Sequence, residues 1–383
     1  MTHTLLRDRG AIVGVGASKQ GKVPGSSALS LAVDAFKAAL DDSGLRKEQI
    51  DGLLTLPGQT SPEGTQNFLR IGETLGINPR YAGTMNLGGS TAGALVQQAV
   101  LAVNAGMATH VACVFGDAAA TGGGRFDRAQ GWGDSSSIWG YMAAAANSAL
   151  TAARHMAVYG TTSRQLGEIA VACRYHASMN PEAVMRQPIT VDDHQASRWI
   201  VEPLHLLDCC LVSDGGVCII VSSAERARDL KQPAVLISGM GQGYTTENLG
   251  SEDWWYAPHQ KLAVQDAYAM AGVGPADIDV AQLYDNFTSS VLLWLEHGGF
   301  CKPGEAGPFC EGGRIQLGGA LPINTAGGNL SESFMEGWLH IVEGTRQMRG
   351  HCGERQVADA EVCLVTGRGL ALNCANAMVL RKG

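Results

Sequence analysis

"LAVDAFKAALDDSGLRKEQIDGLLT" (residues 31–55) and "LAVQDAYAMAGVGPADIDVAQLYD" (262–285) follow the same pattern. Each segment has apolar residues at helical spacing, then a glycine, a short polar link and an apolar run. The glycines are Gly44 and Gly272, and each precedes an Ile-Asp pair at the same distance. Glycine just after a helical pattern commonly ends a helix, so both segments predict a helix, a turn and a strand.

The helical parts of the two segments can be aligned through matching residues. The Asp-Ala-Phe of 34–36 matches the Asp-Ala-Tyr of 266–268, which would make the second helix four residues, or about one turn, shorter. A glycine-rich apolar strand precedes each helix, at 11–21 and at 233–243. This alternation predicts an α/β protein with two similar halves related by a pseudo-twofold axis.

We expect the two halves to span residues 1–230 and 231–383. Residues from about 115 to 200 interrupt the first half with loops and helical patterns, and are predicted to form an inserted lid over a central site. The predicted helices of this insertion are an alanine-rich one near 141–157 and one that begins at Thr162 or Ser163 and ends before Asn180.

A glycine pair later in each half precedes a further apolar segment. The segments are "NLGGSTAGALVQQAVLAVNAG" (86–106) and "NTAGGNLSESFMEGWLHIVEGTRQMRG" (324–350). The first is almost free of charge and predicts a helix over 91–103 that is buried nearly all round. The second predicts a helix that starts at its glycine pair and carries an apolar stripe: Leu330, Phe334, Trp338, Ile341 and Val342. Glycines at a helix start let a ligand approach free N–H groups, so both pairs are candidate binding positions near the centre.

Composition narrows the classes of partner and compartment. The formal net charge is −8 without a basic block, which argues against nucleic acid or an anionic membrane as partner. The chain has no signal pattern at its N-terminus and no run of about 18 apolar residues, so we expect a cytoplasmic protein without a membrane span. Its 10 cysteines are scattered without CxxC pairs, which predicts reduced thiols and no metal site.

Three short motifs each have two interpretations. "GASKQGKV" (16–23) fits a phosphate loop except that Val23 replaces the final Ser or Thr, so a glycine-rich strand exit is favoured. "GGSTA" (88–92) nearly matches the GxSxG elbow, but the last glycine is displaced by one residue. Ser90 taken alone is therefore favoured as a helix N-cap over a nucleophile. The aromatic "DWWYAP" (253–258) suits a lipophilic substrate, a partner surface or a loop anchor.

Tyr284 and Asp285 lie where an apolar strand ends and the helical pattern "SVLLWLEHGGF" follows. Strand ends near a topological centre are where α/β proteins place chemistry. A capping aspartate beside a half-buried tyrosine is the structural alternative. The residues alone leave both interpretations open.

Five segments together resemble the thiolase superfamily, in its sterol-carrier-protein-thiolase or lipid-transfer-protein branch. They are "AIVGVGASKQGK", "YGTTSRQLGEIAVACRYHASMNP", "PLHLLDCCLVSDGG", "QLYDNFTSSVLLWLEHGGFCKPGE" and the segment 324–350, and the resemblance runs over essentially the whole chain. It implies the thiolase fold: two duplicated five-stranded α/β halves in five layers, helix–sheet–helix–sheet–helix, normally as a homodimer. It further implies a coenzyme A thioester as substrate, no tightly bound cofactor, and oxyanion holes at the N-termini of two central helices.

The catalytic residues of thiolases are replaced at the matching positions. The nucleophilic cysteine matches Ser90, and the histidine of the Gly-His-Pro motif matches Phe334. The last cysteine, of a Cys-x-Gly motif, matches Val365 before Gly367, and Tyr284 stands where thiolases have Asn or His. A Cys–His system needs thiolate and base together, so ordinary thiolysis is not expected.

The steroid side-chain aldolases of this branch resemble thiolases turned to retro-aldol cleavage of a β-hydroxyacyl-CoA, with tyrosines at the positions of Tyr284 and Phe334. We therefore predict an acyl-CoA enzyme that cleaves or forms a C–C bond through a thioester enolate, with Tyr284 moving the β-hydroxyl proton. The catalytic candidates are Tyr284, Ser90 and Asp285. The candidates for substrate binding are Gly89, Gly327, Gly328, Phe334 and Gly367.

Two alternatives remain, and the resemblance implies a partner. The first alternative is an acyltransferase of the acetyl-CoA acetyltransferase type, acting through Ser90 or a cysteine. The second is a catalytically silent subunit that binds acyl-CoA or lipid. The implied partner is a small zinc-ribbon/OB-fold protein that forms a heterotetramer and supplies the zinc that this chain lacks.

Overall fold

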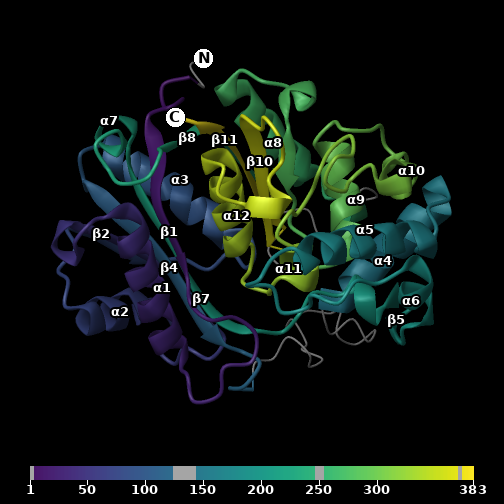
Figure 1. Cartoon of the computed structure of the whole chain (residues 1–383), viewed down its shortest axis with the longest axis horizontal. Coiled ribbons are helices and arrows are strands. Elements are labelled where there is room, and N and C mark those ends of the chain that lie inside the picture. The colour runs from purple at the N-terminus through teal and green to yellow at the C-terminus, as the bar shows by residue number, and fades with distance from the viewer. Residues whose placement is uncertain (1–3, 124–143, 246–253, 370–372) are drawn as a thin grey trace.

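The computed structural model describes residues 4–123, 144–245, 254–369 and 373–383 (Figure 1). Its strands form one mixed sheet in the order β3-β2-β4-β7-β1-β8-β11-β10-β9. In that order the strands are β3 (Tyr81–Thr84), β2 (Gly52–Pro57), β4 (His110–Ala118), β7 (Asp214–Ser223), β1 (Gly10–Ala17), β8 (Val235–Tyr244), β11 (Cys374–Lys382), β10 (Val362–Gly369) and β9 (Val280–Gln282). A separate hairpin pairs β5 (Trp199–Val201) with β6 (Leu204–His205).

Strand pairing confirms the duplication. In the first half β1 pairs antiparallel with β7 and β7 with β4, followed by the parallel strands β2 and β3. In the second half β8 pairs antiparallel with β11 and β11 with β10, followed by parallel β9. The fifth position of the second half is held by a parallel bridge from Ala281 to Ile323 rather than by a full strand. Among the described residues, only Gly10–Ile12 and Val235–Ile237 join the halves within the sheet.

The first helix of each half confirms the predicted unit but corrects its alignment. Helices α1 (Ala28–Ser43) and α8 (Pro258–Ala271) end at left-handed Gly44 and Gly272. A Cβ on Gly16 of β1 would lie 2.5 Å from the Ala35 carbonyl oxygen, and one on Gly241 of β8 would lie 2.0 Å from that of Ala263. Ala35 is therefore structurally equivalent to Ala263. This residue lies four positions earlier than the one that the match of 34–36 with 266–268 paired with Ala35. The strand glycines set this register because they let the helix backbone rest directly on the strand.

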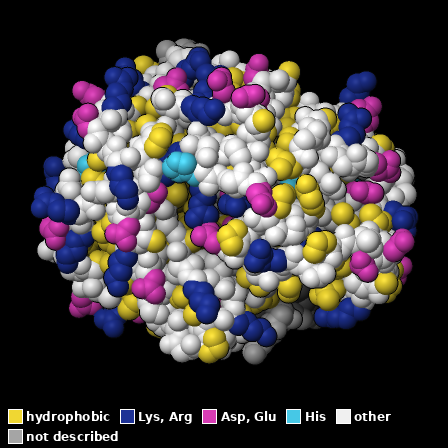
Figure 2. Space-filling model, in the orientation of Figure 1, with side chains coloured by type: hydrophobic (Ala, Val, Ile, Leu, Met, Phe, Trp, Pro, Cys, Tyr) yellow, Lys and Arg dark blue, Asp and Glu magenta, His cyan; other side chains and the backbone are white. Residues whose placement is uncertain are grey.

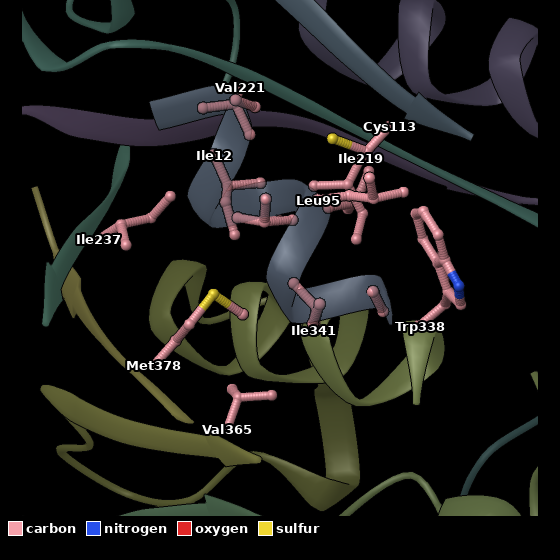
Figure 3. Close-up of a cluster of buried hydrophobic side chains, with 14 of the residues drawn as sticks. Ile12, Leu95, Cys113, Ile219, Val221, Ile237, Trp338, Ile341, Val365 and Met378 are labelled. Atoms are coloured by element: carbon pink, nitrogen blue, oxygen red, sulfur yellow. The ribbon is translucent and has the colours of Figure 1, made fainter. Parts of the chain in front are cut away.

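The remaining helices complete five layers. Helices α3 (Thr91–Asn104) and α12 (Trp338–Arg349) lie side by side between the two halves of the sheet, and Figure 3 shows their side chains meeting those of both halves. The outer layers are α1 with α2 (Asn67–Leu75) on the first half and α8 with α9 (Thr288–His297) on the second. The other helices are α4 (Ala144–Tyr159), α5 (Ser163–Ser178), α6 (Val191–Ala196), α7 (Ala224–Ala227), α10 (Ala306–Cys310) and α11 (Gly328–Ser331).

The central helices only partly match the sequence. Helix α3 is buried as predicted, whereas the helix expected from Gly327 onward is broken. The glycine pair opens only the four-residue α11, and α12 begins at Trp338. Between them residues 332–337 form a loop in which Glu336 has φ 48° and Gly337 has φ 83°. Leu330 and Phe334 therefore do not belong to the apolar stripe of α12, because these two left-handed residues interrupt the helical path.

Two described helices of the predicted insertion pack on the second half. Helices α4 and α5 share a hydrophobic cluster with α9, and α5 also contacts α11 (Figure 1). The Thr162 side chain accepts a hydrogen bond from the Gln165 amide, which confirms the predicted start of α5. Residues 124–143, where part of the predicted lid falls, lie outside the described residues.

The surface agrees with the charge pattern of the sequence. On the face drawn in Figure 2, basic and acidic side chains are interspersed without a broad patch of one sign. Within the described ranges, no helix is long and apolar enough to cross a membrane.

Candidate active site

Tyr284 reaches from the end of β9 to the start of central helix α3. Its amide donates to Thr366 Oγ1 at 3.0 Å, which fixes the backbone against β10. Its side chain is buried, and a Cβ on Gly89 would lie 2.0 Å from the Tyr284 hydroxyl oxygen. A Cβ on Gly337 would lie 3.0 Å from the ring. The phenol therefore lies at the N-terminus, or mouth, of α3. It fits between two backbone segments because each has a glycine where a side chain would collide with it.

The environment of Tyr284 favours the protonated phenol. Burial raises its pKa well above the ordinary value, and the neighbouring acidic groups of Glu336, Cys210 and Asp285 add to this effect. Arg368 opposes the shift as the smallest contribution. A phenol in this state donates a hydrogen bond but does not act as a base at neutral pH. Because helix N-termini present unpaired N–H groups, the hydroxyl and the first turn of α3 can act on one ligand oxygen.

Ser90 lies beside Tyr284 but is held by Asn376. The Asn376 Nδ2 atom donates to the Ser90 carbonyl oxygen at 2.7 Å and to Oγ at 2.8 Å. Ser90 holds the predicted N-cap position of α3, but its side chain accepts no hydrogen bond from the α3 backbone. Within the described structure no histidine side chain bonds to Ser90. A serine without an adjacent base is a weak nucleophile.

Gly367 belongs to the same cluster. A Cβ there would lie 2.7 Å from Asn376 Nδ2 and 2.9 Å from the Gly89 carbonyl oxygen. The structure thus brings together four of the predicted residues: Tyr284, Ser90, Gly89 and Gly367.

A Gly89→Ala substitution is expected to lower turnover about 10²-fold, because the added methyl displaces the Tyr284 hydroxyl from the mouth of α3. Steady-state kinetics together with thermal unfolding checks this. Gly72→Ala is the matched control, since its Cβ would meet no atom closer than 3.5 Å. Wild-type turnover by Gly89→Ala would show that the phenol is not needed at this place.

Asp285 lies at the start of α11, where Gly327 and Gly328 are expected to bind substrate. Its Oδ1 atom accepts from the Asn329 amide and from His340 Nε2, both at 2.9 Å, and the side chain is fully buried. A Cβ on Gly328 would lie 2.1 Å from Asp285 Oδ2. The N-terminus of α11, predicted to receive a thioester, is therefore occupied by the Asp285 carboxylate. Asp285 therefore caps α11 and not α9, the following helix at whose start the sequence suggested a cap.

Phe334 lies in the loop between α11 and α12. Its amide donates to Ser213 Oγ at 3.2 Å, and the residue is buried. A phenyl ring cannot transfer a proton, so any acid–base group in this loop must come from another residue.

Glu336, two residues further along the loop, was not among the predicted site residues. Its pKa is raised to about 7, first by burial and then by the charge of Asp117. Within the described structure its buried Oε2 atom has no hydrogen-bond partner. In the sequence, Glu336 looks like an acidic residue in the first turn of a helix, where the helix dipole favours it, so the pattern gave no sign of this environment.

Comparisons with known proteins add to this geometry. Residues 241–382 match the family model described as thiolase C-terminal domain-like. A "steroid side-chain-cleaving aldolase" of Thermomonospora curvata is 40% identical, covering 95% of this chain and 96% of that protein. A "17-hydroxy-3-oxo-4-pregnene-20-carboxyl-CoA lyase" of Mycobacterium tuberculosis is also 40% identical, covering 94% and 97%. The solved structure of an "Ltp2-ChsH2(DUF35) aldolase" superposes with a TM-score of 0.90 at 38% identity, covering 99% of both chains.

Proposed function

Because the chain belongs to the thiolase superfamily, in the branch of the steroid side-chain-cleaving aldolase, we propose that it performs retro-aldol cleavage of a β-hydroxyacyl-CoA. The β-hydroxyl loses its proton and the β-carbon becomes a carbonyl. The Cα–Cβ bond breaks, and its electron pair forms the thioester enolate. The α-carbon then takes up a proton. The products are an aldehyde or ketone and a shortened acyl-CoA, and no free coenzyme A is consumed.

The observation that carries this proposal is a buried, protonated phenol at the mouth of α3 without a nucleophile beside it. Ser90 is held by Asn376, and burial raises the pKa of the nearby thiols of Cys210 and Cys374, so neither forms a reactive thiolate readily. A site of this kind stabilises developing charge rather than forming a covalent bond to substrate.

Each element has a defined part in the reaction. The thioester carbonyl oxygen lies against Gly89 and the first turn of α3, where N–H groups and the Tyr284 hydroxyl donate to the enolate oxygen. One such donor typically contributes 10²–10³-fold in rate. The names of the two relatives support a C–C lyase over an acyltransferase, and one names a hydroxylated acyl-CoA.

No covalent acyl group is expected on Ser90. After incubation with a β-hydroxyacyl-CoA and with a β-ketoacyl-CoA, peptide mass spectrometry should show the Ser90 peptide unmodified, because its hydroxyl lacks a base. Protein kept without acyl-CoA is the control. A mass increase equal to the acyl group on that peptide would instead support the acyltransferase alternative.

The assembly is part of the same proposal. The structurally similar aldolase carries a DUF35 component in its name, which supports a small partner for this chain as well. We expect a homodimer that binds a small zinc-ribbon/OB-fold protein as a heterotetramer in the cytoplasm. Co-purification with zinc analysis and light scattering tests this, and a zinc-free dimer that stays fully active alone would contradict it.

Turnover tests the proposed reaction against the silent-subunit alternative. The protein, alone and with its partner, is assayed with a β-hydroxyacyl-CoA and with a β-ketoacyl-CoA plus free coenzyme A. Cleavage of the hydroxy compound alone is the expected result. Cleavage of only the keto compound would indicate a thiolase, and binding without cleavage of either would indicate a silent subunit.

A further inference from the structure

Glu336 has a backbone conformation that a non-glycine residue rarely adopts. Its φ is 48°, and the left-handed Gly337 follows it, so the loop turns sharply just before α12 begins. Strained backbone of this kind persists where the surrounding structure holds it, and it concentrates at functional sites. Here the turn places Gly337 against the Tyr284 ring, and Glu336 immediately before it.

The Glu336 carboxyl group differs from the buried carboxylates in the described part of the chain. Those carboxylates are engaged by hydrogen-bond donors from side chains or backbone: Asp117, Asp208, Asp214, Asp285, Glu296, Glu332 and Glu343. Glu336 Oε2 is equally shut off from solvent, yet no donor in the described part of the chain reaches it. The residue as a whole is half-buried, although this oxygen is not exposed.

The charged and titratable neighbours of Glu336 come from several elements. They are Asp117 at the end of β4, Cys210 before β7 and Tyr284 after β9, while Asp285 and the β10 residue Arg368 act on Tyr284. The carboxylate of Asp117 is already engaged, because it accepts from the amides of Gln59 and Thr60 and from the Thr60 hydroxyl. Glu336 forms no ion pair with any described residue.

We propose that Glu336 is the proton acceptor for the β-hydroxyl in the reaction proposed above, on which this inference rests. The carboxylate takes the hydroxyl proton as the Cα–Cβ bond breaks and the electron pair moves into the thioester enolate. The resulting carboxylic acid returns the proton to the α-carbon, so the residue ends as it began. Tyr284 remains protonated and donates to the enolate oxygen. Because Phe334 has no hydroxyl group, the acid–base oxygen of this loop comes from Glu336, two residues further along the chain.

The protonation states of Glu336 and Tyr284 agree with their roles as proton acceptor and hydrogen-bond donor. The pKa of Glu336 is raised to about 7, so near neutral pH a large fraction is carboxylate in an environment that makes it a better base. The carboxylate is the active form. The cleavage rate should therefore rise with pH through about 7 and level off above it.

The test compares Glu336→Gln with Glu332→Gln in the complete complex. Cleavage of a β-hydroxyacyl-CoA is followed over about two pH units on either side of 7. Glu336→Gln should lower the rate about 10²–10⁴-fold and abolish the rise near neutral pH, with KM little changed. Glu332 is the matched control on the same loop, because its side chain already accepts from Asn180 Nδ2 at 3.3 Å, burial raises its pKa, and glutamine replaces it isosterically. Glu332→Gln should keep the wild-type rate and profile.

The outcomes separate this inference from the proposed function. If the wild-type complex cleaves no β-hydroxyacyl-CoA, the proposed function fails and the inference fails with it. If the wild type cleaves and Glu336→Gln retains its rate within a few-fold, only the inference is overturned. Should Glu336→Gln fail to fold, the wild-type profile and Glu336→Asp decide. A rise near pH 7 with partial activity in Glu336→Asp supports the role, and a flat wild-type profile overturns it.

Discussion

Tyr284→Phe is expected to lower the cleavage rate by about 10²–10³-fold while leaving the fold and acyl-CoA binding intact. The substitution removes only the hydroxyl oxygen, which lies against Gly89 at the mouth of α3. The ring continues to fill its buried position beside Gly337. The enolate oxygen then loses one hydrogen-bond donor in the transition state, so kcat should fall more than KM changes. Steady-state kinetics and acyl-CoA binding by calorimetry measure the two effects separately.

Tyr268→Phe is the matched control for this prediction. Its hydroxyl donates to the Gly298 carbonyl oxygen on the outer side of the second half, away from α3. Its loss should leave kcat within a few-fold of wild type. If Tyr284→Phe behaves like this control, Tyr284 is a packing residue and the enolate must be stabilised by other groups.

Asp285→Ala is expected to reduce the free energy of unfolding by about 3–5 kcal/mol. It leaves the buried Asn329 amide and His340 Nε2 without their shared acceptor, and it opens a space beside Gly328. Denaturant unfolding measures the loss. Asp285→Asn should cost less, because its side-chain oxygen can still accept from one of the two donors.

The same pair of variants separates a structural role from a chemical one. If Asp285 is structural, Asp285→Asn folds and retains turnover within about tenfold, since the Asp285 carboxylate binds the start of α11 and not that of α3. A fully stable Asp285→Asn protein with a rate loss as large as that of Tyr284→Phe would assign Asp285 to the chemistry.

The fold could be predicted from the sequence because its determinants are local. Gly44 and Gly272 end the two helices in the left-handed conformation that favours glycine, and the strand order repeats in both halves. The sequence alignment of the first helices was shifted by four residues because it relied on residue similarity alone. The physical determinant was the packing of strand glycines on Ala35 and Ala263, and a one-dimensional comparison does not reveal it.

The site was only partly predictable for a related reason. Tyr284 and Gly89 were found because a strand end and a glycine pair are both visible in the sequence. The role of Gly328 depends on Asp285, which lies more than 40 residues earlier in the chain and fills the α11 terminus through a tertiary contact. Glu336 was missed because a non-glycine residue with positive φ breaks the helix there, and helical spacing continues through the break in the sequence.

The most direct test of the proposed retro-aldol reaction is a cleavage assay in D2O without free coenzyme A. A β-hydroxyacyl-CoA is incubated with the complete complex, and both products are quantified by mass spectrometry. Retro-aldol cleavage predicts one carbonyl product and one shortened acyl-CoA for each substrate consumed, with one deuterium gained at the α-carbon of the acyl-CoA. If cleavage occurs only when free coenzyme A is added, and gives two acyl-CoA products, the protein is a thiolase and the proposed retro-aldol function is wrong.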